Sequence, residues 1–222
     1  MFTGFTQETS DFLFGISFNN ERPWFMEHKG EYERFVKQPL EALGAEVLEI
    51  MRSRHPDDDL QLRVVRIYRD ARRLFGRGPY KDHLWFTVQQ GKTREHTPVF
   101  WFELSADTYA YGAGTWDATP AQMETYRRRI DADPAGFERI ARALAARDGF
   151  KIWGDEYRRP KGDRGEALNK WYNRKAVNAG YEFEFGGDAL TSKLPKTVAD
   201  AFEALMPFYR FLFTVYTMTQ NE

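Results

Sequence analysis

The sequence predicts a single α+β domain over residues 1–222, with a largely antiparallel central sheet covered by helices and with helices at both termini. Three observations favour this fold class. Apolar residues follow the helical period in the first quarter of the chain, short β-branched and aromatic segments come next, and the helical period then returns. Aromatic residues make up 16% of the 222 residues, which is ample apolar material for a core.

Two helical regions are predicted ahead of the sheet, the first at residues 6–14. Pro23 suits the first turn of the next helix, because the N–H that proline lacks has no partner there. Apolar residues then recur at three- and four-residue spacing up to the acidic stretch HPDDD. Pro39 should kink or break this helix. Asn19 or Asn20 either caps it or contacts a ligand.

Four strands are predicted after these helices. Their connections are short, so we expect antiparallel pairing. The second and third strands are apolar on both alternating faces, which predicts central strands covered on both sides. The four segments are 62–68, 83–89, 98–105 and 108–114.

From Thr119 the helical period returns. Residues 119–130 and 133–147 each open with a capping residue followed by proline, which is a helix start signal. The elements predicted after these are a strand at 150–154, a helix at 165–176, a strand at 181–185 and a helix from about residue 196. This last helix should kink or break at Pro207, and its apolar end is either a packed terminal helix or a homodimer face.

Composition narrows the classes of function. Lys and Arg total 32 against 33 Asp and Glu, a net charge of −1, so a dedicated nucleic-acid binder is disfavoured and any anion binding has to be local. The absence of cysteine excludes disulfides, thiolate metal sites and a cysteine nucleophile. The four histidines have no familiar ligand spacing, so neither a metal nor a cofactor is predicted. The chain has no signal-peptide pattern and no membrane-length apolar run, which predicts a cytoplasmic protein without membrane contact.

Positive charge is concentrated in one short segment that contains a single acid. Its seven basic residues are Arg63, Arg66, Arg69, Arg72, Arg73, Arg77 and Lys81, and the acid is Asp70. Strand alternation places Arg66 in an apolar row, where a guanidinium is costly unless it is paired. Its partner is a bound anion, a set of carbonyls, or an acid such as Glu103 in a neighbouring strand. Gly76 and Gly78 open the turn for close backbone approach.

Arginine suits the capture of phosphate or carboxylate, because its planar guanidinium matches two oxygens. Lys81 and Tyr80 would orient such a ligand, while Asp70 would hold the arginines or act as a base. His83 is either an acid–base group or a polar residue that opens a strand. Lys161, in the basic loop RRPKG, is either half of a phosphate clamp or part of a surface turn. The predicted ligand-binding residues are Arg66, Arg69, Asp70, Arg72, Arg77, Tyr80, Lys81, His83 and Lys161.

These residues resemble the signature of a mostly bacterial family catalogued as domain of unknown function 2461. Its pattern R-x-x-R-D-x-R followed by P-Y-K is matched by Arg66, Arg69, Asp70, Arg72, Pro79, Tyr80 and Lys81. Further matches run in order along nearly the whole chain: Asn19, Asn20, Trp24, Phe25, Gly112, Gly114, Pro160, Lys161 and Gly162. Arg77 stands where the family usually has Lys, and Arg73 where it usually has Phe. The family has no established activity, so the resemblance implies a fold unit and a motif but no reaction.

The sequence therefore favours a site for an anionic small molecule that bears phosphate or carboxylate groups. One alternative is a nucleic-acid module in which Phe75, Tyr80 and Trp85 stack on bases. The other is a structural or interaction protein whose arginines form an internal salt-bridge network. No nucleophile–base pair is visible, so the sequence leaves open whether the protein is an enzyme.

Overall fold

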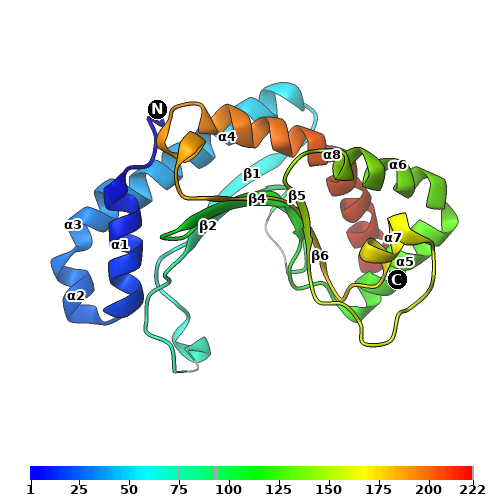
Figure 1. Ribbon diagram of the computed structural model, residues 1–222, viewed down its shortest axis with the longest axis horizontal. Helices are drawn as coiled ribbons and strands as arrows, with labels where there is room; N and C mark the ends of the chain where they lie inside the picture. Colours follow the sequence, from blue (N-terminus) through cyan, green and yellow to red (C-terminus); the bar gives the residue numbers. More distant parts are fainter. Residues whose placement is uncertain (75, 93–94, 222) are drawn as a thin grey trace. The chain divides into compact units, whose positions relative to one another are not determined.

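A computed structural model of the protein describes residues 1–74, 76–92 and 95–221. Its main feature is a six-stranded antiparallel sheet in the order β1-β2-β3-β4-β6-β5, with helices at both ends of the chain (Figure 1). The strands are β1 (Leu60–Val64), β2 (Leu84–Gln90), β3 (Val99–Leu104), β4 (Thr108–Thr115), β5 (Phe150–Trp153) and β6 (Val177–Glu184). The predicted α+β class with an antiparallel sheet is confirmed.

The chain divides into two compact units, each assembled from three segments. The first unit comprises Met1–Val88, Trp101–Ala110 and Glu182–Asp200. The second comprises Gln89–Phe100, Tyr111–Tyr181 and Ala201–Glu222. Strands β2, β3, β4 and β6 and the final helix, α8 (Leu194–Gln220), have residues in both units.

Helices and aromatic side chains build the core of the first unit. Its helices are α1 (Gln7–Phe18), α2 (Arg22–Glu27), α3 (Lys29–Glu31), the π-helix η1 (Tyr32–Lys37) and α4 (Gln38–Arg54). The Phe102 ring stacks on Phe86 with centroids 5.3 Å apart and on Phe5 with centroids 6.2 Å apart. Helix α4 buries Leu40, Leu43, Val47 and Met51. The core of this unit is therefore closed by the apolar stripe that the sequence predicted for this helix.

The helical segment is not broken at Pro39. The π-helix η1 runs directly into α4, and Pro39 lies in the first turn of α4. Proline leaves the carbonyl four residues earlier, that of Phe35, without its usual N–H partner. Thr9, which is fully buried on α1, donates its hydroxyl to this carbonyl at 2.6 Å. Packing of α1 thus replaces the hydrogen bond that proline removes.

The second unit holds the two helices with the clearest start signals. Its helices are α5 (Pro120–Ala132), α6 (Pro134–Ala145), α7 (Glu166–Tyr172) and most of α8. Thr119 and Gln122 form a reciprocal capping box at α5, and Asp133 accepts the Gly136 N–H at 2.8 Å at α6. Helix α8 is continuous across Pro207, so of the two predicted outcomes, a kink or a break, the break is absent. Its apolar residues Phe208, Tyr209 and Leu212 are buried, as in a packed terminal helix.

Three strands differ from expectation. β1 ends at Val64, earlier than the predicted end at residue 68, and β6 begins at Val177, earlier than the predicted start at residue 181. Cover is incomplete on one face of β2, where Trp85 and Thr87 are half-buried. The early end of β1 matters most, because it releases the basic segment from the regular sheet.

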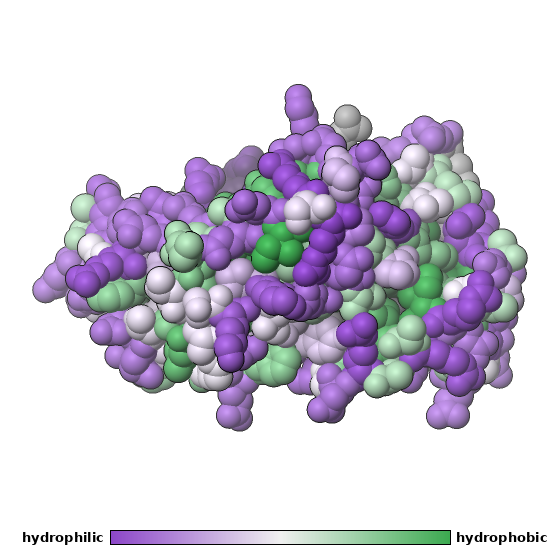
Figure 2. All heavy atoms as spheres, turned by 90° about the horizontal axis from the view of Figure 1, so that it is seen from above, coloured by the Kyte–Doolittle hydropathy of each residue, from purple (hydrophilic) through white to green (hydrophobic). Residues whose placement is uncertain are grey.

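The surface is largely polar. In Figure 2, hydrophilic side chains dominate the visible face, and apolar residues show in small separate patches. Exposed apolar side chains include Phe14 and Phe18 of α1, whose rings contact each other at 4.8 Å between centroids. Among the described residues, no helix combines the length and the apolar character that crossing a bilayer requires.

Candidate anion-binding site

Residues 63–85 of the first unit, the basic hairpin, carry the arginine motif. The hairpin leaves the sheet at the end of β1, turns at the short helix η2 (Ala71–Arg73) and returns into β2 (Figure 1). Backbone hydrogen bonds join its arms, from Val65 N to Trp85 O (2.9 Å), from Lys81 N to Ile67 O (2.8 Å) and from Arg69 N to Pro79 O (2.8 Å). Because backbone groups alternate in direction along an extended chain, the carbonyls between these residues point toward the opposite edge.

Asn20 fixes the returning arm of the hairpin. Its Nδ2 donates to the Tyr80 carbonyl and its Oδ1 accepts the Tyr80 N–H, each at 2.9 Å. A side chain on Gly78 would collide with Asn20, so the glycine permits this close approach as the sequence suggested. The predicted capping of the helix after Pro23 by an asparagine is wrong, because Glu21 holds the N-cap position of α2.

Arg69 is a structural member of the cluster. Its Nε donates to the Tyr80 carbonyl at 2.6 Å and its Nη2 to Asp82 Oδ1 at 2.9 Å. Only 12% of its side chain is exposed. Burial by itself would raise the pKa of Asp82, but backbone hydrogen bonding, His83 and Arg69 together lower it. Arg69 is therefore held by a carboxylate that stays ionised.

Arg72 and Asp70 are paired with each other. Asp70 accepts from Arg72 Nε at 3.1 Å and from Nη2 at 2.8 Å, and it also accepts the Arg72 backbone N–H at 3.0 Å. The Arg72 side chain is 87% exposed, so the pair contributes little to stability. The effect of the pair is local, because its hydrogen bonds hold the turn of the hairpin and use both carboxylate oxygens of Asp70.

The cleft itself lies along the hairpin and has a volume of about 540 Å³. Its wall contains Tyr68, Asp70 and five cationic residues, namely Arg63, Arg66, Arg69, Arg77 and Lys81. Arg63, Arg66 and Arg77 are exposed and form no ion pair with an acid among the described residues. Arg66 is therefore not buried in an apolar row as predicted, because the regular strand stops two residues before it. The cleft holds more positive charge than its own carboxylates balance.

Lys81 is placed by the backbone of the outgoing arm. Its ammonium donates to the carbonyls of Arg66 and Tyr68, each at 2.6 Å, and lies 5.7 Å from the Trp85 ring centroid. Burial, followed by the charges of Arg69 and Arg66, lowers the pKa of Lys81. An ammonium has three N–H donors, so one remains for a ligand in the cleft.

Aromatic residues of the hairpin take different positions. Tyr80 is buried and its ring stacks on Phe25 with centroids 4.2 Å apart, so this ring supports the hairpin from behind. Tyr68 lines the cleft and is 50% exposed. Phe75, which the sequence offers as a stacking surface, lies outside the described residues. The exposed aromatic surface of the cleft is thus that of Tyr68, which sequence reasoning missed because it read this residue as part of a regular strand.

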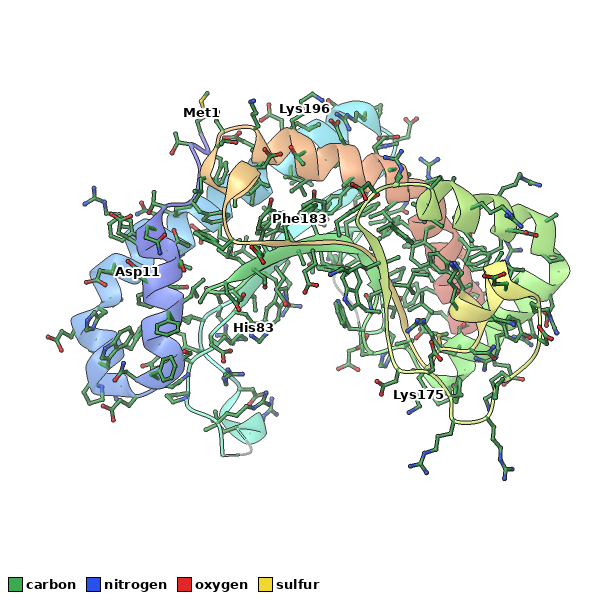
Figure 3. The ribbon with its side chains drawn as sticks, in the orientation of Figure 1. Met1, Asp11, His83, Lys175, Phe183 and Lys196 are labelled. Atoms are coloured by element: carbon green, nitrogen blue, oxygen red, sulfur yellow. The ribbon has the colours of Figure 1, made fainter. Side chains whose placement is uncertain are left out.

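His83 lies where the hairpin joins β2 (Figure 3). Its Nδ1 is 3.0 Å from Asp82 Oδ1, and its ring stacks on Trp85 with centroids 5.5 Å apart. Glu103, on β3, interacts electrostatically with His83 and Glu182, and Arg66 is not among the groups that shift its pKa, contrary to the alternative that paired Glu103 with Arg66. Burial first, and then Glu182, raise the pKa of Glu103, while His83 lowers it. The described residues contain no cluster of three acids, histidines or cysteines placed to hold a metal ion.

Lys161 belongs to the second unit. Its backbone N–H donates to Asn173 Oδ1 at 2.7 Å, and its ammonium lies 4.6 Å from the Tyr157 ring centroid. Arg127 lies 5.5 Å from the same centroid. Asn173 also accepts the Gly162 N–H at 3.3 Å and donates to the Gly162 carbonyl at 3.1 Å, so one buried amide organises the whole loop. These contacts fit the interpretation of the RRPKG loop as a surface turn.

The fold and the hairpin define an α+β protein in which an irregular β-hairpin carries several arginines without carboxylate partners among the described residues. The chain belongs to the family described as conserved hypothetical protein (DUF2461), whose model matches residues 8–211. The family resemblance drawn from the sequence is therefore confirmed. A comparison with curated proteins gives no match. Neither result names an activity, so a function has to be argued from the geometry of the cleft.

Proposed function

We propose that the protein binds a small molecule bearing phosphate or carboxylate groups in the cleft of the basic hairpin. The observation that carries the proposal is the set of guanidinium groups, those of Arg63, Arg66 and Arg77, that line the cleft without an acidic partner among the described residues. Each offers a planar pair of donors suited to two oxygens of one anion. Lys81 adds an N–H from a fixed position.

Part of the cluster supports the competing idea of an internal salt-bridge network. Arg69 is bonded to Asp82 and Arg72 to Asp70. However, this network does not include Arg66, and its acids Asp82 and Asp70 are paired with the other two arginines. We therefore assign the paired arginines to the structure of the hairpin and the others to the ligand.

A thermal-shift screen at low salt tests the proposal. The panel contains inorganic phosphate, pyrophosphate, sugar phosphates, mono- and dicarboxylates and a short oligonucleotide. A ligand at 100 times its dissociation constant should stabilise the fold by about 2.7 kcal/mol, a rise in Tm of roughly 5–11 °C for a chain of this size. Low salt is needed because exposed charges are strongly screened at high ionic strength.

The variants give the screen its specificity. Arg66→Ala and Arg77→Ala should each reduce the shift, and the double variant should abolish it. Arg139→Ala, which removes an exposed arginine from α6, is the matched control and should leave the shift intact. A full panel without a shift, or a shift that the double variant retains, would contradict the proposal.

A further inference from the structure

A second hollow adjoins the cleft in the first unit. Its volume is about 350 Å³, and it shares the wall residues Val64, Val65, Arg66 and Tyr68 with the cleft. The outgoing arm of the basic hairpin therefore forms part of the wall of both hollows. Arg66 and Tyr68 border both hollows, and both volumes are within the range of about 300–1,000 Å³ typical of small-molecule sites.

The second hollow is aromatic where the first is cationic. Phe25, Tyr32 and Tyr68 stand in its wall. The Tyr68 ring meets Phe25 edge-on at 5.8 Å and Tyr80 at 5.4 Å between centroids, so the ring is supported by its neighbours. Half of Tyr68 nevertheless stays exposed. A supported ring with free surface is suited to stacking against a planar ligand group.

Polar groups border this aromatic wall. Burial, with smaller contributions from Glu33 and Glu41, raises the pKa of Tyr32, so its phenol stays protonated and able to donate a hydrogen bond. Glu33 and Lys37 also line the hollow and form an ion pair at 2.9 Å. The hollow thus offers donors and acceptors at the margin of a stacking surface. This combination suits a planar ring with polar edges better than a plain hydrocarbon ring.

The backbone supplies an independent indication that this hollow is built for binding. Tyr32, Glu33 and Lys37 all come from the π-helix η1. π-Helical turns are rare and occur frequently at functional sites. Within η1, the Phe35 carbonyl accepts a hydrogen bond from the buried Thr9 hydroxyl at 2.6 Å. A buried contact from α1 therefore supports this unusual backbone, which lines the second hollow.

We propose that the ligand is a nucleotide with more than one phosphate group, a conclusion that rests on the anion-binding function proposed above. Its phosphates lie among Arg63, Arg66, Arg77 and the free N–H of Lys81, because several unpaired cations are matched by several negative charges. Its base stacks on Tyr68 in the second hollow, where Tyr32 and Glu33 meet the polar edges of the ring. Arg66 and Tyr68 are the residues at which the two parts of the ligand join.

Calorimetric titration of the full chain with parts of such a ligand tests this inference. The probes are pyrophosphate, the diphosphates of adenosine, guanosine, cytidine and uridine, free adenosine and a six-nucleotide oligothymidylate. At least one nucleoside diphosphate should bind about tenfold or more tightly than pyrophosphate, in line with the usual contribution of base–aromatic stacking. Tyr68→Ala should remove that gain, so that the nucleoside diphosphate no longer binds more tightly than pyrophosphate, while Tyr68→Phe should keep it.

Phe18→Ala is the matched control, because it removes another exposed aromatic side chain of the same unit and should change neither affinity. Pyrophosphate binding without any preference for a nucleotide would overturn this inference and leave the proposed function standing. No binding of any phosphate compound would overturn this inference, and the proposed function would then stand only if a carboxylate of the thermal-shift panel binds. An oligonucleotide that binds more tightly than every nucleoside diphosphate, with loss in Tyr68→Ala, would replace the nucleotide by nucleic acid.

Discussion

The side-chain amide of Asn20 makes with the backbone of Tyr80 the two hydrogen bonds that a neighbouring strand would make. The two residues are 60 positions apart in the sequence, and the contact ties the loop after α1 to the returning arm of the basic hairpin. The Tyr80 carbonyl also accepts from Arg69. The backbone of one residue, Tyr80, therefore holds together a helix connection, a hairpin and the largely buried arginine of the cluster.

We expect Asn20→Ala to lower the free energy of unfolding by about 1–3 kcal/mol, because it leaves buried backbone groups of Tyr80 with fewer partners. Asn20→Asp keeps the acceptor and loses the donor, so its loss should be smaller than that of the alanine variant. Chemical denaturation measures both, and hydrogen exchange at the Tyr80 amide should accelerate in Asn20→Ala. Unchanged exchange at this amide would show that the clamp does not hold the hairpin.

Gly78→Ala should destabilise the protein by about 1–3 kcal/mol through overpacking against Asn20. Gly76→Ala is a useful comparison. Gly76 has a φ of +80° but no atom near its would-be side chain, so its alanine variant loses only about 1–2 kcal/mol through backbone strain. In the double variant Asn20→Ala/Gly78→Ala the clash is relieved, and the two losses should be less than additive. Full additivity in denaturant melts would show that the two residues do not interact.

Arg69 and Arg66 should differ sharply in their effects on stability. Arg69→Ala removes hydrogen bonds to a carbonyl and to an ionised carboxylate, and should lower the free energy of unfolding by about 1.5–3 kcal/mol. Arg66→Ala removes an exposed side chain and should change it by no more than about 0.5 kcal/mol. Urea denaturation of the two variants without ligand makes the comparison. A large loss in Arg66→Ala would return this residue to the salt-bridge network.

Glu103 should make stability depend on pH in the acidic range. Burial and Glu182 raise its pKa above the ordinary 4.5, so the folded protein binds the proton more tightly than the unfolded chain. Ionised Glu103 therefore destabilises the fold at neutral pH, and Glu103→Gln should be the more stable protein there. As pH falls through the raised pKa toward 4.5, wild type recovers and the difference should disappear.

Thermal melts of wild type and Glu103→Gln between pH 4 and pH 8, at roughly half-unit steps, check this prediction. The pair is repeated in a His83→Gln background, because His83 lowers the pKa of Glu103. A constant difference between the two proteins at every pH would contradict the expected linkage.

Local signals in the sequence predicted the parts of the fold that local contacts determine. The starts of α5 and α6 were readable because Thr119 and Asp133 bond to N–H groups three residues on. The continuity of the helical segment at Pro39 could not be predicted, because the hydrogen bond that proline removes is replaced by one from Thr9 on another helix. The early start of β6 was also hidden, since Asn178 and Gly180 weaken the strand pattern of residues that are nevertheless buried.

For the candidate site, too, the sequence predicted some features and missed others. The count of charged residues located the basic segment, and the glycines within that segment predicted the close approach found at Gly78. Period-two alternation predicted that Arg66 lies in a buried row, and this is wrong. Cross-hairpin hydrogen bonds pair Val65 with Trp85 and Ile67 with Lys81, so two residues on one arm correspond to four on the other. This unequal spacing ends the regular strand before Arg66. The position of Tyr68 beside a second hollow depends on that same irregular pairing and has no signature in the sequence.

The placement of Lys81 also bears on self-association. β1 stands at one end of the strand order, so the arm that extends from it has no further strand beside it in the described sheet. Exposed strand edges template pairing with other chains, and lysine is one of the residues that block such pairing. By covering the outward carbonyls of Arg66 and Tyr68, the Lys81 ammonium occupies acceptors that an incoming strand would need. The ammonium to which we assign an anion contact in the cleft is thus also placed to hinder the pairing of another strand at this edge.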